Sequence, residues 1–381
     1  MTGSSLRVAV IVPRFAPYLG GAETYAAQAA AALAAEGAEV TVITQIPRGT
    51  TLSARDRRDG YTIERHYLPL GEVFDVPSPS AARAARQSRR FDVVWVHSYH
   101  TPLAWLAAEQ SKAPVVLTPW YHGAGHTPMR NALHRFYRPA GRRLMTACRR
   151  ILVATEAEAD LVLRDFPRHV DRDKITLVPV GVPDPTGGRE PYPGESNIVL
   201  TVARQEPYKR TDVLIRAIAE LRDRGVPARL VVVGQGSGLA ACKELATALD
   251  ANDVVTFTGA IDDESLGRWW ASASLYATAS LHEAFGLCLG EALVAGLPVV
   301  ASRIGAHREV VRRAGPGAAA ALCEVDAPCE AVTQYADAIA RLLSSSESRK
   351  ERSARCTLPT EADMVSHLLE TLTEAGSVRQ R

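Results

Sequence analysis

Short, continuous apolar runs alternate with segments of helical period along almost the whole chain of 381 residues. The first two runs are Leu6–Val12 and Glu39–Thr44, and the Ala-rich segment Tyr25–Glu36 lies between them, followed by a helix-terminating Gly37. Continuous apolar runs are typical of parallel strands that helices bury on both faces. The sequence therefore predicts an α/β protein built from doubly wound parallel sheets.

A stretch rich in proline and glycine, residues 183–196, interrupts the alternation, which restarts after it. We therefore predict two Rossmann-like domains, residues 1–183 and 197–358, joined by a linker at 184–196, with a last helix within 359–381. Ligands of such sheets bind at the carboxyl ends of strands, so we expect functional residues on the following loops, lining an interdomain cleft. The other predicted strands are 91–97, 114–118, 150–154, 175–180, 198–203, 230–233, 254–258, 275–278 and 298–301, and helical segments include 81–90 and 129–148 and begin near 209, 239, 262, 285 and 306.

The composition is that of a soluble globular protein, with 46% apolar and 23% charged residues. No apolar run is long enough for a membrane-spanning helix, and because the residues before the first strand lack the features of a secretory leader, we expect none. The six cysteines form no CxxC pair and lack zinc-ligand spacing, which predicts reduced thiols, no metal and a cytoplasmic location. Residues 1–183 carry 23 basic and 16 acidic side chains, which we interpret as a solvated surface, so peripheral membrane contact is not required.

Two cations follow the strand 198–203, because Arg204 ends that strand and Lys209 begins the next helix. A guanidinium fork and a lysine point charge suit a diphosphate, although an ordinary surface ion-pair site would use the same residues. The chain has 39 arginines and only 5 lysines, so a lysine at this position is informative.

Two carboxylates, Glu283 and Glu291, flank the helix start Phe285–Gly286–Leu287. Backbone N–H groups at a helix start bind anions, and Glu291 in an apolar stretch suits the vicinal diol of a ribose. The alternatives are a capping box formed by Ser280 and Glu283, and an exposed helical position for Glu291.

Weaker signals lie in other loops. Gly20 and Gly21 precede the first helix. They would let backbone N–H groups approach a phosphate, and the alternative is an ordinary turn between a strand and a helix. The loop 118–126 carries aromatic and histidine side chains suited to sugars, with a structural role as the alternative for each histidine. Gly234 opens a glycine-rich turn that resembles half a dinucleotide fingerprint without its acidic partner. The candidates for acceptor contacts in the first domain are Tyr99, His100, Trp120 and Tyr121.

Together, Arg204 with Lys209 five residues later and Glu283 with Glu291 eight residues later resemble the R-x4-K and E-x7-E motifs of retaining glycosyltransferase family 4. The glycine loop and the His122 loop also match in position, so the resemblance covers nearly the whole chain. Departures are Ala203, Arg210 and Ala284, each at a position where the family usually has glycine.

The resemblance implies a GT-B fold whose last helix crosses back to the first domain, and metal-independent sugar transfer with retained anomeric configuration. His122, Glu283, Arg204 and Lys209 would be the catalytic residues. The residues implied to hold the nucleotide-diphosphate sugar are Gly20, Gly21, Arg204, Lys209, Gly234, Ile261, Glu283, Phe285, Gly286, Leu287 and Glu291. No cofactor beyond this donor is expected, nor a nucleic acid partner.

The acceptor is left open between a natural-product scaffold, a lipid-linked acceptor and a small polyol. Two other functions remain open: a nucleotide-sugar epimerase on the same scaffold, and a nucleotide-sugar-binding protein without turnover. The base, the sugar and the oligomeric state are not predicted by any residue of the sequence.

Overall fold

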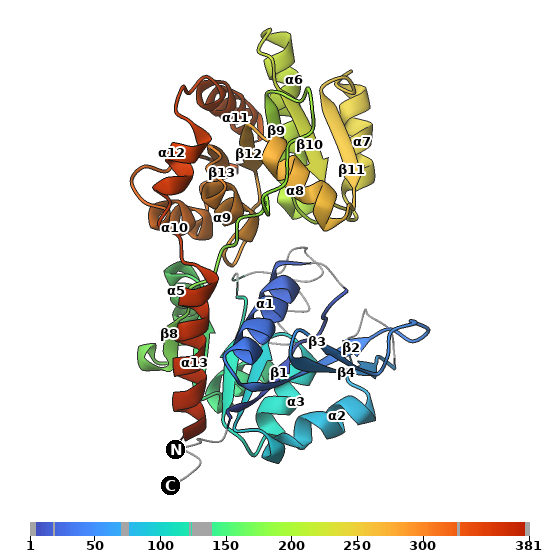
Figure 1. Ribbon diagram of the computed structural model, residues 1–381, viewed down its shortest axis with the longest axis vertical. Helices are drawn as coiled ribbons and strands as arrows, with labels where there is room; N and C mark the ends of the chain where they lie inside the picture. Colours follow the sequence, from blue (N-terminus) through green and yellow to red (C-terminus); the bar gives the residue numbers. More distant parts are fainter. Residues whose placement is uncertain are drawn as a thin grey trace. The chain divides into compact units, whose positions relative to one another are not determined.

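The computed structural model describes residues 5–17, 20–69, 76–121, 123, 139–325 and 328–377. The chain divides into two compact units, shown in Figure 1. Unit 1 comprises residues 1–181 and 361–381, and unit 2 comprises residues 182–360. Each unit has its own sheet with helices on its faces, so both are α/β units of the predicted class.

Unit 1 is built on an eight-stranded sheet in the order β3-β4-β2-β1-β5-β6-β7-β8. All neighbouring strands pair in parallel except β3 and β4, which form an antiparallel pair. The central strands are apolar and buried, as helices on both faces require. The strands are β1 (Arg7–Ile11), β2 (Glu39–Ile46), β3 (Arg55–Arg58), β4 (Tyr61–Tyr67), β5 (Val93–His97), β6 (Val115–Thr118), β7 (Arg150–Val153) and β8 (Ile175–Leu177).

The helices of unit 1 include α1 (Gly21–Ala35), α2 (Pro79–Arg86), α3 (Pro102–Gln110), α5 (Glu156–Asp165) and α13 (Glu361–Ser377). The last of these packs beside α1 and against β5 and β6, so the end of the chain belongs to unit 1 (Figure 1). Its apolar stripe, which includes Met364, Leu368 and Leu372, is fully buried there.

Unit 2 has a six-stranded parallel sheet in the order β11-β10-β9-β12-β13-β14. On one face, α6, α7 and α11 cover a core of aliphatic side chains, while α9 packs against β12 and β13. The strands are β9 (Ile198–Val202), β10 (Arg229–Val233), β11 (Val255–Gly259), β12 (Leu275–Thr278), β13 (Val299–Ser302) and β14 (Ala320–Cys323). The helices are α6 (Thr211–Asp223), α7 (Leu239–Ala248), α8 (Asp263–Ser272), α9 (Leu287–Val294), α10 (Gly305–Arg313), α11 (Pro328–Leu343) and α12 (Arg349–Ala354).

The predicted linker differs from the structure. Residues 184–196 belong to unit 2, where Arg189 Nε lies 2.9 Å from a carboxylate oxygen of Glu264 and the Tyr192 N–H donates to Ser272 Oγ at 2.7 Å. Proline and glycine shape an irregular segment here, but these two polar contacts join it to α8. The chain passes between the units at residues 181–182 and 360–361.

Several elements escape the sequence patterns. β3 is fully exposed and reads Arg-Asp-Arg-Arg, so it has no apolar signal, and β4 alternates apolar and polar residues. β3 is the edge strand of the sheet and β4 is next to it, where burial on two faces is not required. Much of the helical segment predicted at 129–148 lies outside the described residues.

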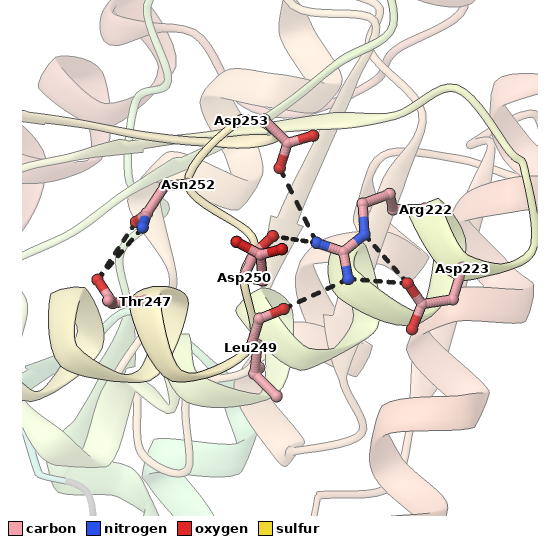
Figure 2. Close-up of polar contacts among 7 residues, drawn as sticks. All are labelled: Arg222, Asp223, Thr247, Leu249, Asp250, Asn252 and Asp253. Atoms are coloured by element: carbon pink, nitrogen blue, oxygen red, sulfur yellow. Dashed lines mark hydrogen bonds and ion pairs between the residues drawn. The ribbon is translucent and has the colours of Figure 1, made fainter.

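A polar cluster centred on Arg222 lies at the C-terminal end of α6 (Figure 2). Its guanidinium donates to Asp223 at 2.8 Å and to the Leu249 carbonyl at 3.3 Å, contacts the Asp250 carbonyl, and lies 3.9 Å from Asp253. The two carbonyls follow the end of α7, where backbone acceptors have no partner within the helix. Arg222 therefore ties α6 to the connection between α7 and β11.

Candidate functional site

The loop that follows β9 carries the two predicted cations and is held by Gln205. The buried Gln205 amide donates to the carbonyls of Ala203 and Val233, both at 3.0 Å, and accepts from Thr211 Oγ1 at 2.7 Å. Lys209 ends a 3₁₀ turn, Pro207–Lys209. Arg204 is exposed and forms no ion pair within the described ranges, so its guanidinium is available to an anion.

The glycine-rich turn after β10 packs directly on this loop. The Gln205 N–H donates to the Gln235 carbonyl at 2.9 Å, and the Gly238 N–H donates to the Gln205 carbonyl at 2.7 Å. A Cβ on Gly234 would lie 2.0 Å from the Ala203 carbonyl oxygen, and one on Gly236 would lie 2.5 Å from that of Gln205. The glycines thus permit close approach of two backbones, which explains a fingerprint-like pattern without a dinucleotide role.

Lys209 and Glu283 meet between two loops of unit 2. Lys209 Nζ lies 2.5 Å from Glu283 Oε1, with 15% and 21% of the side chains exposed. Burial opposes both charges, but the pair outweighs it: Glu283 raises the pKa of Lys209, and Lys209 lowers the pKa of Glu283. Both side chains are therefore charged at neutral pH and poised to contact polar ligand groups.

The start of α9 is open to an anion. Its N-cap is Gly286, in the left-handed conformation at φ 94°, with no side chain bonded to the first turn. In the described ranges, the N–H groups of Leu287 and Cys288 have no acceptor, as expected for the first turn of a helix. The alternative capping box does not form, because Ser280 Oγ donates to the His282 carbonyl and Glu283 pairs with Lys209. Phe285 is buried in the protein interior, so only its backbone remains a candidate.

Glu291 lies one turn into α9 and is largely shielded from solvent. Burial raises its pKa to about 7, against a smaller opposite effect of the Cys288 thiol, which hydrogen-bonds to it. A carboxylate in this state gains from hydroxyl donors, so ligand hydroxyls would favour its charged form. Gly234 and Ile261 follow β10 and β11 of the same sheet.

The candidates in unit 1 fare differently. His122 lies outside the described residues. Gly20 is the N-cap of α1 in an extended conformation, and α1 begins at Gly21. A Cβ on Gly20 would lie 2.3 Å from a carboxylate oxygen of Glu23, so the glycine lets that side chain fold back over the helix start.

Tyr99 and Tyr121 are core residues, which argues against the acceptor contacts predicted for them. They are 4% and 1% exposed and pack edge to face, with ring centroids 5.0 Å apart. The Tyr121 hydroxyl donates to Asp165 at 2.5 Å, and its backbone N–H donates to the buried Glu158 at 2.7 Å. They were candidates because they follow strands, but here the aromatic rings turn inward.

Trp120 and His100 remain accessible. His100 is exposed, and Trp120 is half-buried with a left-handed backbone at φ 52°. The Trp120 indole N–H donates to Nδ1 of the buried His97 at 3.3 Å, and its ring packs on Tyr25. Burial lowers the pKa of His97 to about 3, so that ring is neutral and structural.

Two further properties concern the described ranges only. No helix in them combines the length and the apolar content needed to cross a membrane. Nor do these residues include three or more His, Cys, Asp or Glu side chains grouped so that they could hold a metal ion.

Comparison with known proteins identifies this arrangement. Residues 19–184 match the model of "Glycosyltransferase Family 4" and residues 188–356 that of "Glycosyl transferases group 1". A D-inositol 3-phosphate glycosyltransferase of Stackebrandtia nassauensis is 31% identical over 75% of this chain and 72% of its own length. A second from Catenulispora acidiphila is 29% identical over 93% of this chain and 91% of its own. The chain belongs to glycosyltransferase family 4.

Solved structures extend the agreement to the fold. Sucrose-phosphate synthase of Thermosynechococcus elongatus superposes with a TM-score of 0.75 at 20% identity, covering 97% of this chain and 100% of that one. The lipopolysaccharide glycosyltransferase WaaG gives 0.66 at 18% identity, covering 97% and 99%. The two Rossmann-like units are thus those of a GT-B glycosyltransferase, and this family 4 member is an enzyme that uses a nucleotide sugar.

Sequence reasoning missed three residues that shape the loops of Lys209 and Glu283: Gln205, Ser302 and His307. All three are buried and act on neighbouring loops. Gln205 lies between the motif residues Arg204 and Lys209, which was the available signal. No pattern marks Ser302 or His307, because the bond that joins Ser302 to the loop carrying Glu283 ends at Ser280, in another part of the chain.

Proposed function

We propose that this enzyme transfers a sugar from a nucleotide-diphosphate sugar to a hydroxyl acceptor, with retention and without a metal ion. The observation that carries the proposal is the charged Lys209–Glu283 pair, joined to an uncapped α9 start. Lys209, the free Arg204 guanidinium and the α9 N–H groups would bind the diphosphate, and Glu283 would accept hydrogen bonds from the donor sugar. Glu291 would hold the ribose diol.

In the transfer step, the bond between the anomeric carbon and the β-phosphate oxygen breaks. The acceptor oxygen bonds to that carbon on the same face, and the acceptor proton passes to the leaving phosphate. Negative charge grows on the diphosphate, so fixed cations and helix N–H groups stabilise the transition state most. His122 would contact the donor sugar as a hydrogen-bond partner.

This charge arrangement supports metal independence, because two cations and a helix start supply what Mg²⁺ would otherwise provide. The Asp171–Asp173 pair, which resembles a metal-binding sequence, lies before β8 in a 3₁₀ turn and not after a strand. Ligands in such sheets bind at the opposite ends of the strands.

The relatives supply the first acceptor to test. Two named above are inositol 3-phosphate glycosyltransferases, so a phosphorylated cyclic polyol belongs to the small-polyol class that the sequence left open. For the donor, Anabaena HepE, which shares 16% identity and a TM-score of 0.72, was solved with UDP and glucose, so uridine nucleotides come first.

The test begins with thermal unfolding of the full chain against UDP, GDP and ADP. A nucleotide at about 100 times its dissociation constant adds roughly 2.7 kcal/mol to stability. Transfer from the matching nucleotide sugar to inositol phosphate is then followed by NMR with and without EDTA. We expect an axial or equatorial linkage that matches the donor, at a rate insensitive to EDTA.

Each other outcome contradicts part of the proposal. Inversion overturns retention, and loss of activity on chelation with recovery on adding Mn²⁺ or Mg²⁺ overturns metal independence. Conversion of the donor sugar without acceptor would indicate an epimerase. Nucleotide-sugar binding with neither hydrolysis nor transfer to any acceptor class would indicate a binding protein.

A further inference from the structure

The loop between β12 and α9, residues 279–286 (the 279–286 loop), carries Glu283 and leads into the open helix start. On the proposed function, this loop holds the donor sugar and diphosphate. Its position therefore matters for catalysis. Three of its groups are tied to other elements: Glu283 to Lys209, the Leu281 N–H to the Tyr208 carbonyl at 2.9 Å, and the Ser280 carbonyl to Ser302.

The third tie leads to a buried histidine. Ser302 Oγ, at the end of β13, lies 2.5 Å from the Ser280 carbonyl, and His307 Nδ1, in the first turn of α10, lies 2.9 Å from Ser302 Oγ. The His307 Nδ1 also lies 3.1 Å from the Ser302 carbonyl. Ser280, Ser302 and His307 are at most 1% exposed, so water does not compete for these bonds.

The geometry fixes the proton on one ring nitrogen. A carbonyl only accepts, so Ser302 must donate its single hydroxyl proton to Ser280. Ser302 Oγ is then the acceptor toward His307, as is the Ser302 carbonyl. Nδ1 is therefore the donor and carries the proton. Burial also lowers the pKa of His307 to about 4, so the ring is neutral and Nε2 has no proton at pH 7.

The other edge of the same ring reaches the end of the loop. A Cβ on Gly286 would lie 3.0 Å from His307 Cδ2 and 3.2 Å from Nε2, and Gly286 has a left-handed φ of 94°. The ring thus fills the space beside the Gly286 Cα. Through Ser302 at Ser280, and by packing at Gly286, one side chain contacts both ends of the 279–286 loop.

We propose that His307 is a positioning residue, which in its Nδ1-protonated form fixes the 279–286 loop and so places Glu283 and the start of α9 for the donor. It touches no substrate in this role. A neutral ring suits the position, since a third cation next to the Lys209–Glu283 pair would compete with Lys209 for Glu283.

The variants separate the two contacts. His307→Leu keeps bulk beside Gly286 and removes the N–H donor, whereas His307→Asn keeps a donor near the Nδ1 position and removes the ring. Ser302→Ala removes the hydroxyl that joins His307 to Ser280 and leaves His307 Nδ1 its bond to the Ser302 carbonyl. His367→Leu is the matched control, because this exposed α13 histidine bonds only within its own helix, at the Asp363 carbonyl.

We expect His307→Leu and Ser302→Ala each to lower kcat by about 5- to 30-fold, the range for one lost hydrogen bond that orients a reacting group. The acceptor KM should stay within about twofold, because the loop holds the donor and not the acceptor. The double variant should be no worse than either single one, and His307→Asn should recover part of the loss. Unchanged kcat in both single variants, or fully additive losses, would overturn the proposal.

A second measurement needs no turnover. In ¹⁵N-histidine-labelled full-length enzyme at pH 7, the ring signal that is lost in His307→Asn should be that of a histidine with a protonated Nδ1 and a bare Nε2. An Nε2-protonated or cationic His307 would overturn the proposal even if transfer is normal. Conversely, the expected tautomer in an enzyme that binds no nucleotide sugar would contradict the proposed function and not this assignment. The spectrum also decides the case if His307→Leu fails to fold.

Discussion

The two units use polar residues after strands in opposite ways. In unit 2, Arg204, Lys209, Glu283 and Glu291 keep charged or titratable groups available to a ligand, and a second set of buried side chains holds their loops. In unit 1, Tyr99 and Tyr121 turn into an aromatic core. Charges that must stay hydrated or paired resist burial, whereas aromatic rings gain from it. A charge motif is therefore a more reliable guide to a site than an aromatic one.

Breaking the Lys209–Glu283 pair is the strongest test of this contrast. Lys209→Ala removes the proposed diphosphate contact. It also leaves Glu283 buried without its partner, and breaking a buried pair in this way lowers the free energy of unfolding by roughly 3–5 kcal/mol. We expect kcat/KM to fall on the order of 100-fold or more. Steady-state kinetics measures this, with Lys243→Ala on the exposed face of α7 as the control. Wild-type kinetics in Lys209→Ala would show that the pair is structural only.

Glu291 sharpens the comparison through pH. Its folded-state pKa of about 7 lies above the ordinary 4.5, so the folded protein binds more protons than the unfolded chain between these values. Stability contributed by the protonated form is therefore present below about pH 4.5 and is lost as the pH rises through about 7. Glu291→Gln cannot ionise, so it should be more stable than wild type at pH 8, by up to roughly 3 kcal/mol, and equal at pH 4. Urea denaturation at both pH values measures the difference.

For the same residue, nucleotide affinity should depend on pH in the direction opposite to stability. Ribose hydroxyls favour the ionised carboxylate, so the affinity of the wild type for UDP should increase from pH 6 to pH 8. The affinity of Glu291→Gln should vary less over that range. A stability difference between the two proteins that does not change with pH would show that Glu291 keeps an ordinary pKa.

The fold class and most strands of unit 2 could be predicted, because the sequence patterns that indicate them lie within short segments of the chain. Buried parallel strands are continuous apolar runs, and the R-x4-K and E-x7-E spacings bring charges to adjacent loop ends. The contacts of Gln205, Ser302 and His307 could not be predicted, since they join loops far apart in sequence. The charged edge strand β3 was not predicted, and residues 184–196 were wrongly predicted as a linker, for the same reason. The structure of both segments depends on neighbouring elements and not on their own composition.

In unit 1, Tyr121→Phe tests whether the core assignment is right. The substitution removes the hydroxyl that donates to Asp165 at 2.5 Å and keeps the ring in place. We expect a loss of about 1.5–3 kcal/mol in unfolding free energy, the range for a hydrogen bond to a charged acceptor, with kcat and both KM values unchanged. A large rise in acceptor KM without loss of stability would instead return Tyr121 to the acceptor site that the sequence predicts.

The smallest expected effect is that of Arg222→Ala, far along α6 from the charge motif. Arg222 joins Asp223 and the carbonyls behind α7, but its side chain is 28% exposed, and ion pairs at the surface contribute little because water and salt screen them (Figure 2). The midpoint of thermal unfolding should fall by less than in Tyr121→Phe, and kinetics should not change. The bonds to carbonyls depend less on salt than the carboxylate pairs do, so part of the loss should persist at 1 M NaCl. A loss that exceeds that of Tyr121→Phe would mean that the connection between α7 and β11 depends on this guanidinium, and that charge in unit 2 supports the fold as well as the site.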